Sequence, residues 1–309
     1  MGNSKTPTNH PATIAMRVVA AWGRRFALRP LNAPAAALNV QARTRGKRLR
    51  PVTGDVVDAH ALEQEEDWLI TRIGQRSNEL VRPDLRGRRE ILAANIDLMV
   101  IVACSSPQAD FFIVDRYLAG ARLMGIDAAL AWNKSDLAPP PTEAAVLAEI
   151  GYPVVEVSAK AALGLAPLQA LMRGRRSIFV GQSGVGKSSL VNALAGEERQ
   201  RTNVISGSKE GKHTTVAAEI IALADGAEII DSPGVRDFAP HIEDVSTVAR
   251  GFREIDAAGA NCRFGNCLHR AEPDCAVKAA VESGAIDHRR YQSYLRLAQL
   301  TRQLQQGRY

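Results

Sequence analysis

Between residues 91 and 240, short apolar runs alternate with stretches that have a helical pattern. Runs of this length, bounded by polar residues, predict buried strands, and the stretches 111–124 and 142–150 predict helices that connect them, while 164–173 is a connection that leads into the strand before the phosphate loop. This alternation predicts an α/β domain with a mostly parallel, doubly wound sheet. The six expected strands are 98–104, 128–132, 154–157, 177–180, 217–223 and 227–230.

Residues 15–90 have a different pattern, in which short apolar stretches are interrupted by glycine and proline. Several short strands in one region of this size favour a small β-barrel of the OB type. Residues 1–14 are polar and are expected to be a disordered tail, and residues 241–309 form a third part with helical patterns at 276–282 and 288–305. The barrel strands are expected at 16–21, 36–41, 56–59 and 68–72.

Composition narrows the class of protein. The chain has 309 residues and a net charge of +6 with a pI near 9.3, which favours an anionic partner. Its apolar runs are shorter than a membrane span, and its polar start lacks the apolar core of a secretory signal. Met1–Thr6 formally matches a myristoylation pattern, which we interpret as part of the polar tail. We expect a cytoplasmic monomer without a membrane partner.

A phosphate-binding loop follows the expected strand 177–180. Its sequence fits G-x-x-x-x-G-K-[ST] and precedes a stretch compatible with a helix. Glycine permits backbone conformations in which successive N–H groups converge on a phosphate, Lys187 would reach the β- and γ-phosphates, and Ser188 would bind Mg²⁺. The nucleotide-contacting residues expected here are Gly181, Gln182, Ser183, Gly184, Val185, Gly186, Lys187, Ser188 and Ser189.

A base-reading element, Asn133-Lys134-Ser135-Asp136, follows the expected strand 128–132. The Asp136 carboxylate can accept hydrogen bonds from both N1–H and N2–H₂ of guanine, whereas N1 of adenine is an acceptor that a carboxylate repels. A kinase or ATPase is therefore a weaker alternative. Ser158-Ala159-Lys160 after the next strand strengthens the interpretation, because a backbone N–H of such an element meets the guanine carbonyl in GTPases.

Two further elements fit the loops that respond to the γ-phosphate. Asp231 and Gly234 of a D-x-x-G element would hold Mg²⁺ through water and sense the γ-phosphate. Thr214 is expected to bind Mg²⁺ in the triphosphate state, although Thr215 beside it remains an alternative. Val235 stands where many GTPases carry the glutamine that orients the attacking water. His213 is our candidate for that role, and a loop histidine without a catalytic role is the alternative.

Three cysteines and one histidine near the C-terminus form a candidate metal site, Cys262-x₄-Cys267-x-His269-x₅-Cys275. Three thiolates and an imidazole are the ligand set of a closed, structural zinc site. Packed free cysteines or a disulfide are the alternatives. Cys104 is expected to be a small core residue.

Basic residues gather in two places outside the central domain. One group lies within eight residues that contain no acid: Arg43, Arg45, Lys47, Arg48 and Arg50. The other lies along the last helix: Arg289, Arg290, Arg296, Arg302 and Arg308. Both could contact RNA phosphates, and solvated surfaces are the alternative.

The base-reading elements precede the phosphate loop, whereas ordinary GTPases have the reverse order. Together with the cysteine pattern, this order closely resembles the bacterial small-ribosomal-subunit-dependent, circularly permuted GTPases, of the ribosome biogenesis GTPase A type, over about residues 15–300. The resemblance implies three domains: an OB-fold RNA-binding domain at 15–90, a permuted GTPase domain at 91–240 and a zinc domain at 241–309.

The resemblance also implies a function. The partner would be the small ribosomal subunit and its rRNA during late assembly, and GTP hydrolysis, stimulated by the subunit, would release the factor. The implied cofactors are GTP or GDP with Mg²⁺ and one structural Zn²⁺. A zinc-dependent RNA-binding module with a merely regulatory nucleotide site is a rival hypothesis of another class.

Overall fold

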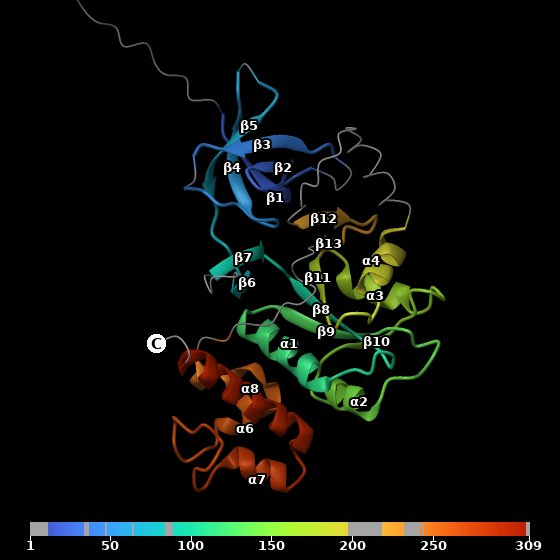
Figure 1. The fold of residues 1–309 in the computed structure, drawn as a ribbon, viewed down its shortest axis with the longest axis vertical. Coiled ribbons are helices and arrows are strands. Elements are labelled where there is room, and N and C mark those ends of the chain that lie inside the picture. The colour runs from blue at the N-terminus through green and yellow to red at the C-terminus, as the bar shows by residue number, and fades with distance from the viewer. Residues whose placement is uncertain are drawn as a thin grey trace, which may run out of the picture.

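The computed structural model describes residues 12–33, 37–46, 48–63, 65–83, 89–196, 218–231, 242 and 244–306. Figure 1 shows three parts in a row, with a β-barrel at one end, an α/β sheet in the middle and a group of helices at the other end. Among the described residues, no helix is long and apolar enough to span a bilayer.

The N-terminal part is a closed barrel of five strands. The strands are paired in the order β1-β2-β3-β5-β4, and β4 pairs back to β1. Apolar side chains such as Met16, Leu28 and Ile70 fill its interior and are at most 2% exposed. The strands are β1 (Ile14–Trp22), β2 (Arg25–Pro30), β3 (Val40–Thr44), β4 (Val56–Ala61) and β5 (Trp68–Ile73).

The predicted barrel is confirmed, but two of its strands differ from the expectation. The strand expected at 36–41 lies later, at β3, and β2 was not predicted at all. Arginines at both ends of β2 hide its alternation in the sequence, whereas in the structure Phe26 and Leu28 point into the barrel core. The pairing of β2 with β1 and β3 supplies the hydrogen bonds that hold it.

A two-stranded hairpin, β6 (Glu79–Pro83) and β7 (Arg89–Ala94), connects the barrel to the central sheet. Leu80 and Ala93 of this hairpin are buried in the same apolar cluster as helix α1 of the central part. The hairpin therefore packs with the central domain, and at the end of β7 the N–H of Ala94 also donates to the carbonyl of Thr53 in the barrel part at 3.0 Å.

The central sheet has the order β10-β9-β8-β11-β13-β12, and its strands are parallel except for the antiparallel β12. This confirms the predicted doubly wound domain. Its strands are β8 (Leu98–Ala103), β9 (Asp127–Trp132), β10 (Val154–Glu156), β11 (Arg176–Val180), β12 (Ala218–Ala222) and β13 (Glu228–Asp231).

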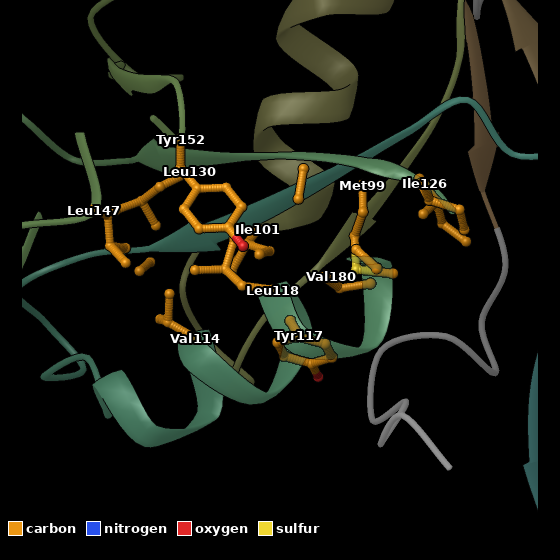
Figure 2. Close-up of a cluster of buried hydrophobic side chains, with 14 of the residues drawn as sticks. Met99, Ile101, Val114, Tyr117, Leu118, Ile126, Leu130, Leu147, Tyr152 and Val180 are labelled. Atoms are coloured by element: carbon orange, nitrogen blue, oxygen red, sulfur yellow. The ribbon is translucent and has the colours of Figure 1, made fainter. Parts of the chain in front are cut away.

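Helices cover both faces of this sheet. On one face, α1 (Phe111–Leu123) and α2 (Thr142–Glu149) enclose the apolar cluster drawn in Figure 2, with Leu118 and Leu147 facing Ile101 and Leu130. On the other face, α3 (Leu165–Met172) and α4 (Lys187–Ala195) cover a second cluster that includes the fully buried Cys104. Cys104 is therefore a core residue, as expected.

The barrel and the central sheet are joined edge to edge. Ala20 and Ala21 of β1 pair with Glu219 and Ala218 of β12, so hydrogen bonding continues from one part into the other. The buried Thr53 hydroxyl donates to the carbonyl of Ala218 at 2.9 Å. This joint fixes the barrel against the strand that precedes β13.

The C-terminal part is helical. The two predicted helices are present as α7 (Ala276–Glu282) and α8 (His288–Gln306). A 3-10 helix, η2 (Val245–Gly251), and α6 (Arg253–Gly259) precede them and were not predicted. Gly251 of η2 lies so close to α1 that an added Cβ would be 2.8 Å from the Cβ of Ala119.

Candidate nucleotide and metal sites

The loops that carry the nucleotide motifs leave the sheet at one edge. In the parallel register, Ala103 of β8 and Glu156 of β10 both lie beside Trp132 at the end of β9, and Val180 of β11 lies beside Ile101. Carboxyl ends of neighbouring parallel strands form the usual ligand crevice of such sheets. Asn133, Ser158, Gly181 and Asp231, each at or just beyond a strand end, are therefore brought to the same edge.

Close packing explains two of the phosphate-loop glycines. Gly181 has φ of 142°, and a Cβ there would lie 2.2 Å from the carbonyl oxygen of Val102. Gly186 has φ of 93°, and a Cβ there would lie 2.4 Å from Nδ2 of Asn133. Only glycine fits both the space and the left-handed conformation at Gly186.

The phosphate loop ends at the N-terminus of α4. Gly186 is the N-cap and provides no side-chain acceptor, so no side chain caps the first N–H groups of the helix. Ser188 and Ser189 lie in the first turn with exposed side chains. Such a terminus favours an anion through its backbone donors and the helix dipole.

Two lysines hold the loop by donating to its carbonyls. Lys187 donates to the carbonyl oxygens of Gly181 and Gln182, both at 2.7 Å. Lys134 of the base-reading element donates to the carbonyls of Gly184, at 3.0 Å, and of Ser106. The base-reading and phosphate-binding loops are therefore in direct contact.

Asn133 links three loops. Its Nδ2 donates to the carbonyl of Val185 at 2.9 Å, its Oδ1 accepts from the backbone N–H of Ala159 at 3.2 Å, and its own N–H donates to Ala103. Asn133 is only 2% exposed. This side chain therefore fixes the distance between the base-reading loops and the phosphate loop.

The remaining residues predicted to read the base differ in their exposure. Asp136 and Lys160 are exposed, and Ser158 is buried, with its Oγ accepting from the N–H of Ala161 at 3.1 Å. The Trp132 indole donates to the carbonyl of Ala138 at 3.0 Å and closes the loop that carries Asp136. No local pattern in the sequence indicated this contact of Trp132.

Asp231, at the end of β13, is the D-x-x-G residue that the structure describes. Several predicted site residues lie outside the described residues: Gly211, His213, Thr214, Thr215, Gly234 and Val235.

The four predicted metal ligands come together between α6 and α7. Their ligand atoms all lie within 4.8 Å of one another. Sγ of Cys262 is 3.8 Å from Sγ of Cys275 and 3.5 Å from Nδ1 of His269, and Sγ of Cys275 is 3.6 Å from Nδ1. Tetrahedral zinc with ordinary bond lengths separates two sulfurs by about 3.8 Å and a sulfur from a nitrogen by about 3.6 Å. The donor set fits zinc in type and in spacing.

The surroundings also favour metal binding. Burial lowers the pKa of the His269 imidazole, which is therefore neutral at pH 7 and offers a lone pair. Burial opposes ionisation of Cys262, but backbone N–H groups of Val277 and Ala276 outweigh it and lower the pKa of this thiol. Burial raises the pKa of Cys267 to about 12, so a cation would be needed to ionise it near neutral pH.

Residues around the ligands hold their loop in place, and sequence reasoning missed them. The hydroxyls of Tyr291 and Tyr294 donate to the carbonyls of His269 and Leu268, both at 2.6 Å. Their spacing of three residues on a predicted helix was a usable signal, because it places both on one face. At Gly259, an added Cβ would lie 3.1 Å from the His269 ring.

Glu272 organises the same loop. Its carboxylate accepts hydrogen bonds from the backbone N–H groups of Leu268, Arg270 and Ala271 at 2.9, 2.7 and 3.1 Å. Although burial opposes ionisation, these donors lower the pKa of Glu272 to about 2. The carboxylate is therefore ionised and satisfied by its own loop.

The basic residues predicted to contact RNA differ in their exposure and in their ion pairs. On the barrel, Arg45, Arg48 and Arg50 are exposed, Arg43 is paired with Glu65 at 2.7 Å, and Lys47 lies outside the described residues.

On the C-terminal helix, Arg290 is 1% exposed and, like Arg289, is paired with the buried Asp115 of α1. Both contribute to the domain joint rather than to a free basic surface. Arg296 and Arg302 line a groove, and Arg308 lies outside the described residues.

Comparison with known sequences identifies relatives. The family model described as RsgA GTPase matches residues 73–240. A protein of Pseudomonas fluorescens named "Small ribosomal subunit biogenesis GTPase RsgA" is 43% identical over 250 residues, covering 79% of this chain and 73% of that protein. A protein of the same name from Alcanivorax borkumensis is 38% identical over 254 residues, covering 80% of this chain and 72% of that protein.

Solved structures with the same fold are also known. The crystal structure of YjeQ from Thermotoga maritima has a TM-score of 0.73 and 25% identity, covering 94% of this chain and 99% of that chain. YloQ, described as a circularly permuted GTPase, has a TM-score of 0.75 and 24% identity, covering 96% and 97%. Because the family model covers more than half of the chain and the named relatives align over about four-fifths of it, this protein belongs to the RsgA GTPase family and is a GTP-hydrolysing enzyme.

Proposed function

We propose that this GTPase acts in late maturation of the small ribosomal subunit, binds its rRNA, and leaves when the subunit stimulates GTP hydrolysis. The main observation in support of this proposal is the match over most of the chain to relatives named for small-subunit biogenesis. The three-part architecture supports it, because the GTPase sheet lies between two parts that carry basic side chains. The proposal makes the protein a cytoplasmic monomer.

In this proposal, GTP binds at the carboxyl edge of the central sheet. Asp136 reads the guanine edge, and Asn133 holds the base-reading loops against the phosphate loop through Val185 and Ala159. The backbone N–H of Ala159 already donates to Oδ1 of Asn133. Either this N–H forms a bifurcated hydrogen bond to Asn133 and the guanine carbonyl, or the N–H of Lys160 donates to that carbonyl instead. Guanine specificity then follows from donor and acceptor matching.

The phosphates bind over Gly181–Ser188, where close packing excludes side chains at Gly181 and Gly186. Lys187 stabilises the charge that develops on the γ-phosphate, and the exposed Ser188 hydroxyl is a ligand for Mg²⁺ together with Thr214. Asp231 holds Mg²⁺ through water. Bound Mg²⁺ neutralises charge on the β- and γ-phosphates.

Slow turnover by the free protein follows from Val235. With valine after the D-x-x-G element, the chain lacks the usual glutamine that orients water, and an external partner has to order the site. His213 is the residue we assign to that water. The subunit accelerates hydrolysis by bringing His213 and Thr214 into position.

Zinc in the Cys262–Cys275 loop is structural. Four protein ligands would complete a tetrahedral zinc shell and would leave no position for a substrate. Zinc supports the fold of the helical C-terminal part. Arg45, Arg48 and Arg50 on the barrel, which are exposed, contact rRNA phosphates.

Steady-state GTP turnover with and without purified small subunits tests the proposal. We expect slow hydrolysis by the free protein and about 10³-fold or greater stimulation by small subunits, as partners give other GTPases. Large subunits are the matched control, and Lys187→Ala should be inactive in every condition. Equal rates with and without small subunits would refute the ribosomal role. Tight GTP binding without multiple turnovers would favour the regulatory-switch hypothesis.

The assignment of His213 has its own test. His213→Ala should remove most of the stimulated rate while GTP affinity and subunit binding stay nearly unchanged, because the loss is confined to the transition state. Full stimulated turnover by this variant would mean that the subunit supplies the water-positioning group.

A further inference from the structure

Asp136, the residue assigned to the guanine base, makes no polar contact of its own. Its side chain is exposed, and it forms no hydrogen bond or ion pair with any residue that the structure describes. The carboxylate is therefore available to a base, but its position depends on the loop that carries it. This loop, residues 133–138, leaves the sheet directly after Trp132 at the end of β9.

The first half of the loop is held by the backbone. The N–H of Leu137 donates to the carbonyl of Lys134 at 2.9 Å. Ser135 and Asp136 are therefore the two central residues of a turn. The N–H of Ser135 donates to the carbonyl of Val157, just beyond the neighbouring strand β10, at 3.1 Å. These bonds fix the chain up to the residue that precedes Asp136.

The second half of the loop cannot be held in the same way. Residues 139–141 are all proline, which has no N–H to donate. Within the described parts of the chain, one hydrogen bond ties residues 138–140 to the sheet, and it runs from Nε1 of Trp132 to the carbonyl of Ala138 at 3.0 Å. A residue that precedes proline is restricted to extended conformations. Ala138 is therefore a firm anchor two residues beyond Asp136.

Trp132 is itself held in the sheet. It is 3% exposed, and its main chain lies between β8 and β10, beside Ala103 and Glu156. Its ring belongs to the apolar cluster that contains Leu147 of α2 and Tyr152. A side chain packed in a core keeps one rotamer, so the indole N–H has a fixed position relative to the sheet.

The place of the indole bond in the loop connects it to base recognition. A buried indole N–H usually finds a partner, so the bond alone does not indicate a role in binding. Here, however, Ser135 fixes one side of Asp136 and Ala138 fixes the other, through Trp132. A carboxylate that reads two adjacent donors has to lie within about 0.5 Å of its productive position. Without the indole bond, the carboxylate would be fixed on one side only.

We propose that Trp132 is a positioning residue for guanine recognition. Its bond to Ala138 holds the Asp136 carboxylate where it meets N1–H and N2–H₂ of the base. Trp132 is buried and acts through the loop, without touching the nucleotide. The inference rests on the proposed reading of guanine by Asp136 and adds the residue that aligns it. A different loop holds the phosphates, so the role of Trp132 concerns affinity for the base and not the chemical step.

Nucleotide discrimination tests this role. Inosine diphosphate, IDP, lacks the N2 amino group, so the preference for GDP over IDP in calorimetry measures how well Asp136 is aligned. Trp132→Phe keeps a ring in the cluster but removes the N–H. A hydrogen bond of this kind contributes a factor of roughly two to ten, and the GDP preference should fall by that factor. The matched control, Trp22→Phe with Trp68→Phe, removes both indoles of the barrel and should keep the wild-type preference.

Turnover separates a positioning role from a role in stability alone. In Trp132→Phe, KM for GTP should rise while kcat of the free protein at saturating GTP keeps its wild-type value, because residues 181–188, which hold the phosphates, are intact. A side chain that only stabilised the fold would give a lower melting temperature with an unchanged ratio of GDP to IDP affinity.

A second measurement tests the inference even where Trp132→Phe folds poorly. The chain has three tryptophans, so in the protein with Trp22→Phe and Trp68→Phe the remaining indole N–H belongs to Trp132. Coupling between two sites is reciprocal, so a base bound to Asp136 should strengthen the bond to Ala138. GDP should therefore slow hydrogen exchange of this indole N–H, measured by NMR, and IDP should slow it less.

The outcomes separate this inference from the proposed function. An unchanged GDP preference in folded Trp132→Phe, or an equal fall in the barrel control, would overturn the role of Trp132 and leave the reading by Asp136 standing. Equal slowing of indole exchange by GDP and IDP, or slowing by neither, would overturn it as well. A wild-type protein that binds GDP and IDP equally would refute base reading by Asp136, and the positioning role with it.

Discussion

Asn133 shows how much one side chain contributes to the nucleotide site. Its carboxamide reaches the phosphate loop on one side and the Ser158–Lys160 loop on the other, and its backbone N–H is bound to the end of β8. Because it is buried, both hydrogen bonds are protected from competing water. The base and phosphate regions are therefore preorganised relative to each other.

The exposed Asp136 should decide which base is bound. In Asp136→Asn, the amide can donate to the carbonyl that xanthine carries at C2, so preference should shift from GTP toward XTP. Lost discrimination could approach roughly 10⁴-fold, as for other sites whose hydrogen-bonding group goes unmatched. Competition binding with the two nucleotides measures it. Glu149→Gln at the exposed end of α2 removes a carboxylate of the same domain and should change nothing. An Asp136→Asn protein that still prefers GTP would disprove the base-reading role.

Gly186 should not tolerate a methyl group. In Gly186→Ala, the Cβ would meet Nδ2 of Asn133 at 2.4 Å, so the hydrogen bond from Asn133 to Val185 has to break or the loop has to move. Gly174→Ala is the control, because Gly174 has φ of 68° but open space around it, and costs only the left-handed strain of about 1–2 kcal/mol. We expect loss of GTP affinity in the first variant alone, measured by calorimetry. Equal affinities would mean that the Asn133 contact is dispensable.

At the scale of elements, the loop between α6 and α7 is held mainly by hydrogen bonds to its backbone and by the cluster of Cys262, Cys267, His269 and Cys275. It contains no strand or helix, and the helices around it are short, so little apolar burial is available to hold it. Hydrogen bonds from Tyr291 and Tyr294 fix two of its carbonyls, and Glu272 collects three of its N–H groups. A bound zinc ion would link four side chains of the loop and so hold it in this arrangement.

Loss of one zinc ligand should unfold this loop and spare the nucleotide site. Cys262→Ser or Cys275→Ser should abolish stoichiometric zinc and lower the melting temperature of the C-terminal part, since zinc binding contributes folding free energy locally. Metal analysis and GTP titration measure the two effects. Cys104→Ala, which removes a buried thiol of the central core, should keep one zinc. Wild-type protein with less than about half an equivalent of zinc and a folded C-terminal part would contradict the metal assignment.

At the scale of the whole molecule, helix α1 joins the nucleotide edge to the C-terminal part. Gln182 of the phosphate loop accepts a hydrogen bond from the N–H of Asp110, the N-cap of α1. Further along the same helix, the fully buried Asp115 holds Arg289 and Arg290 of α8. Both contacts lie in the first half of α1, so this part of the helix connects the phosphate loop directly to α8.

Removing Asp115 should loosen this joint. In Asp115→Ala, the buried Arg290 loses one of its two acidic partners and keeps Glu254, so stability should fall, by less than the roughly 3–5 kcal/mol that a buried charge without any partner costs. Urea unfolding measures the loss, and solution scattering measures any change in the docking of α8. Asp256→Ala breaks an exposed pair with Arg122 across the same joint and should cost at most about 1 kcal/mol. Similar losses of unfolding free energy in the two variants would show that the buried ion pair contributes no more to stability than the exposed one.

Local sequence patterns determined the fold class, the nucleotide motifs and the four residues that cluster as candidate metal ligands. The six strands of the central sheet lie within one residue or so of their predicted positions, because a buried parallel strand is a continuous apolar run that neighbouring polar residues delimit. The clustering of the candidate metal ligands was predictable because three cysteines and a histidine within a short segment have few other uses. The order of the motifs alone indicated the permutation.

Tertiary structure decided what depends on contacts between distant residues. The barrel strand β2 is held by pairing with β1 and β3, so its charged ends gave no usable pattern. Arg289 and Arg302 look alike in the sequence, yet one is paired with Asp115, 174 residues earlier, and the other lines an open groove. The same applies to Asn133 and Val185, 52 residues apart. A side chain's charge state and hydrogen-bond partners are set by whichever groups folding brings within about 3 Å of it, and sequence spacing carries no record of that distance.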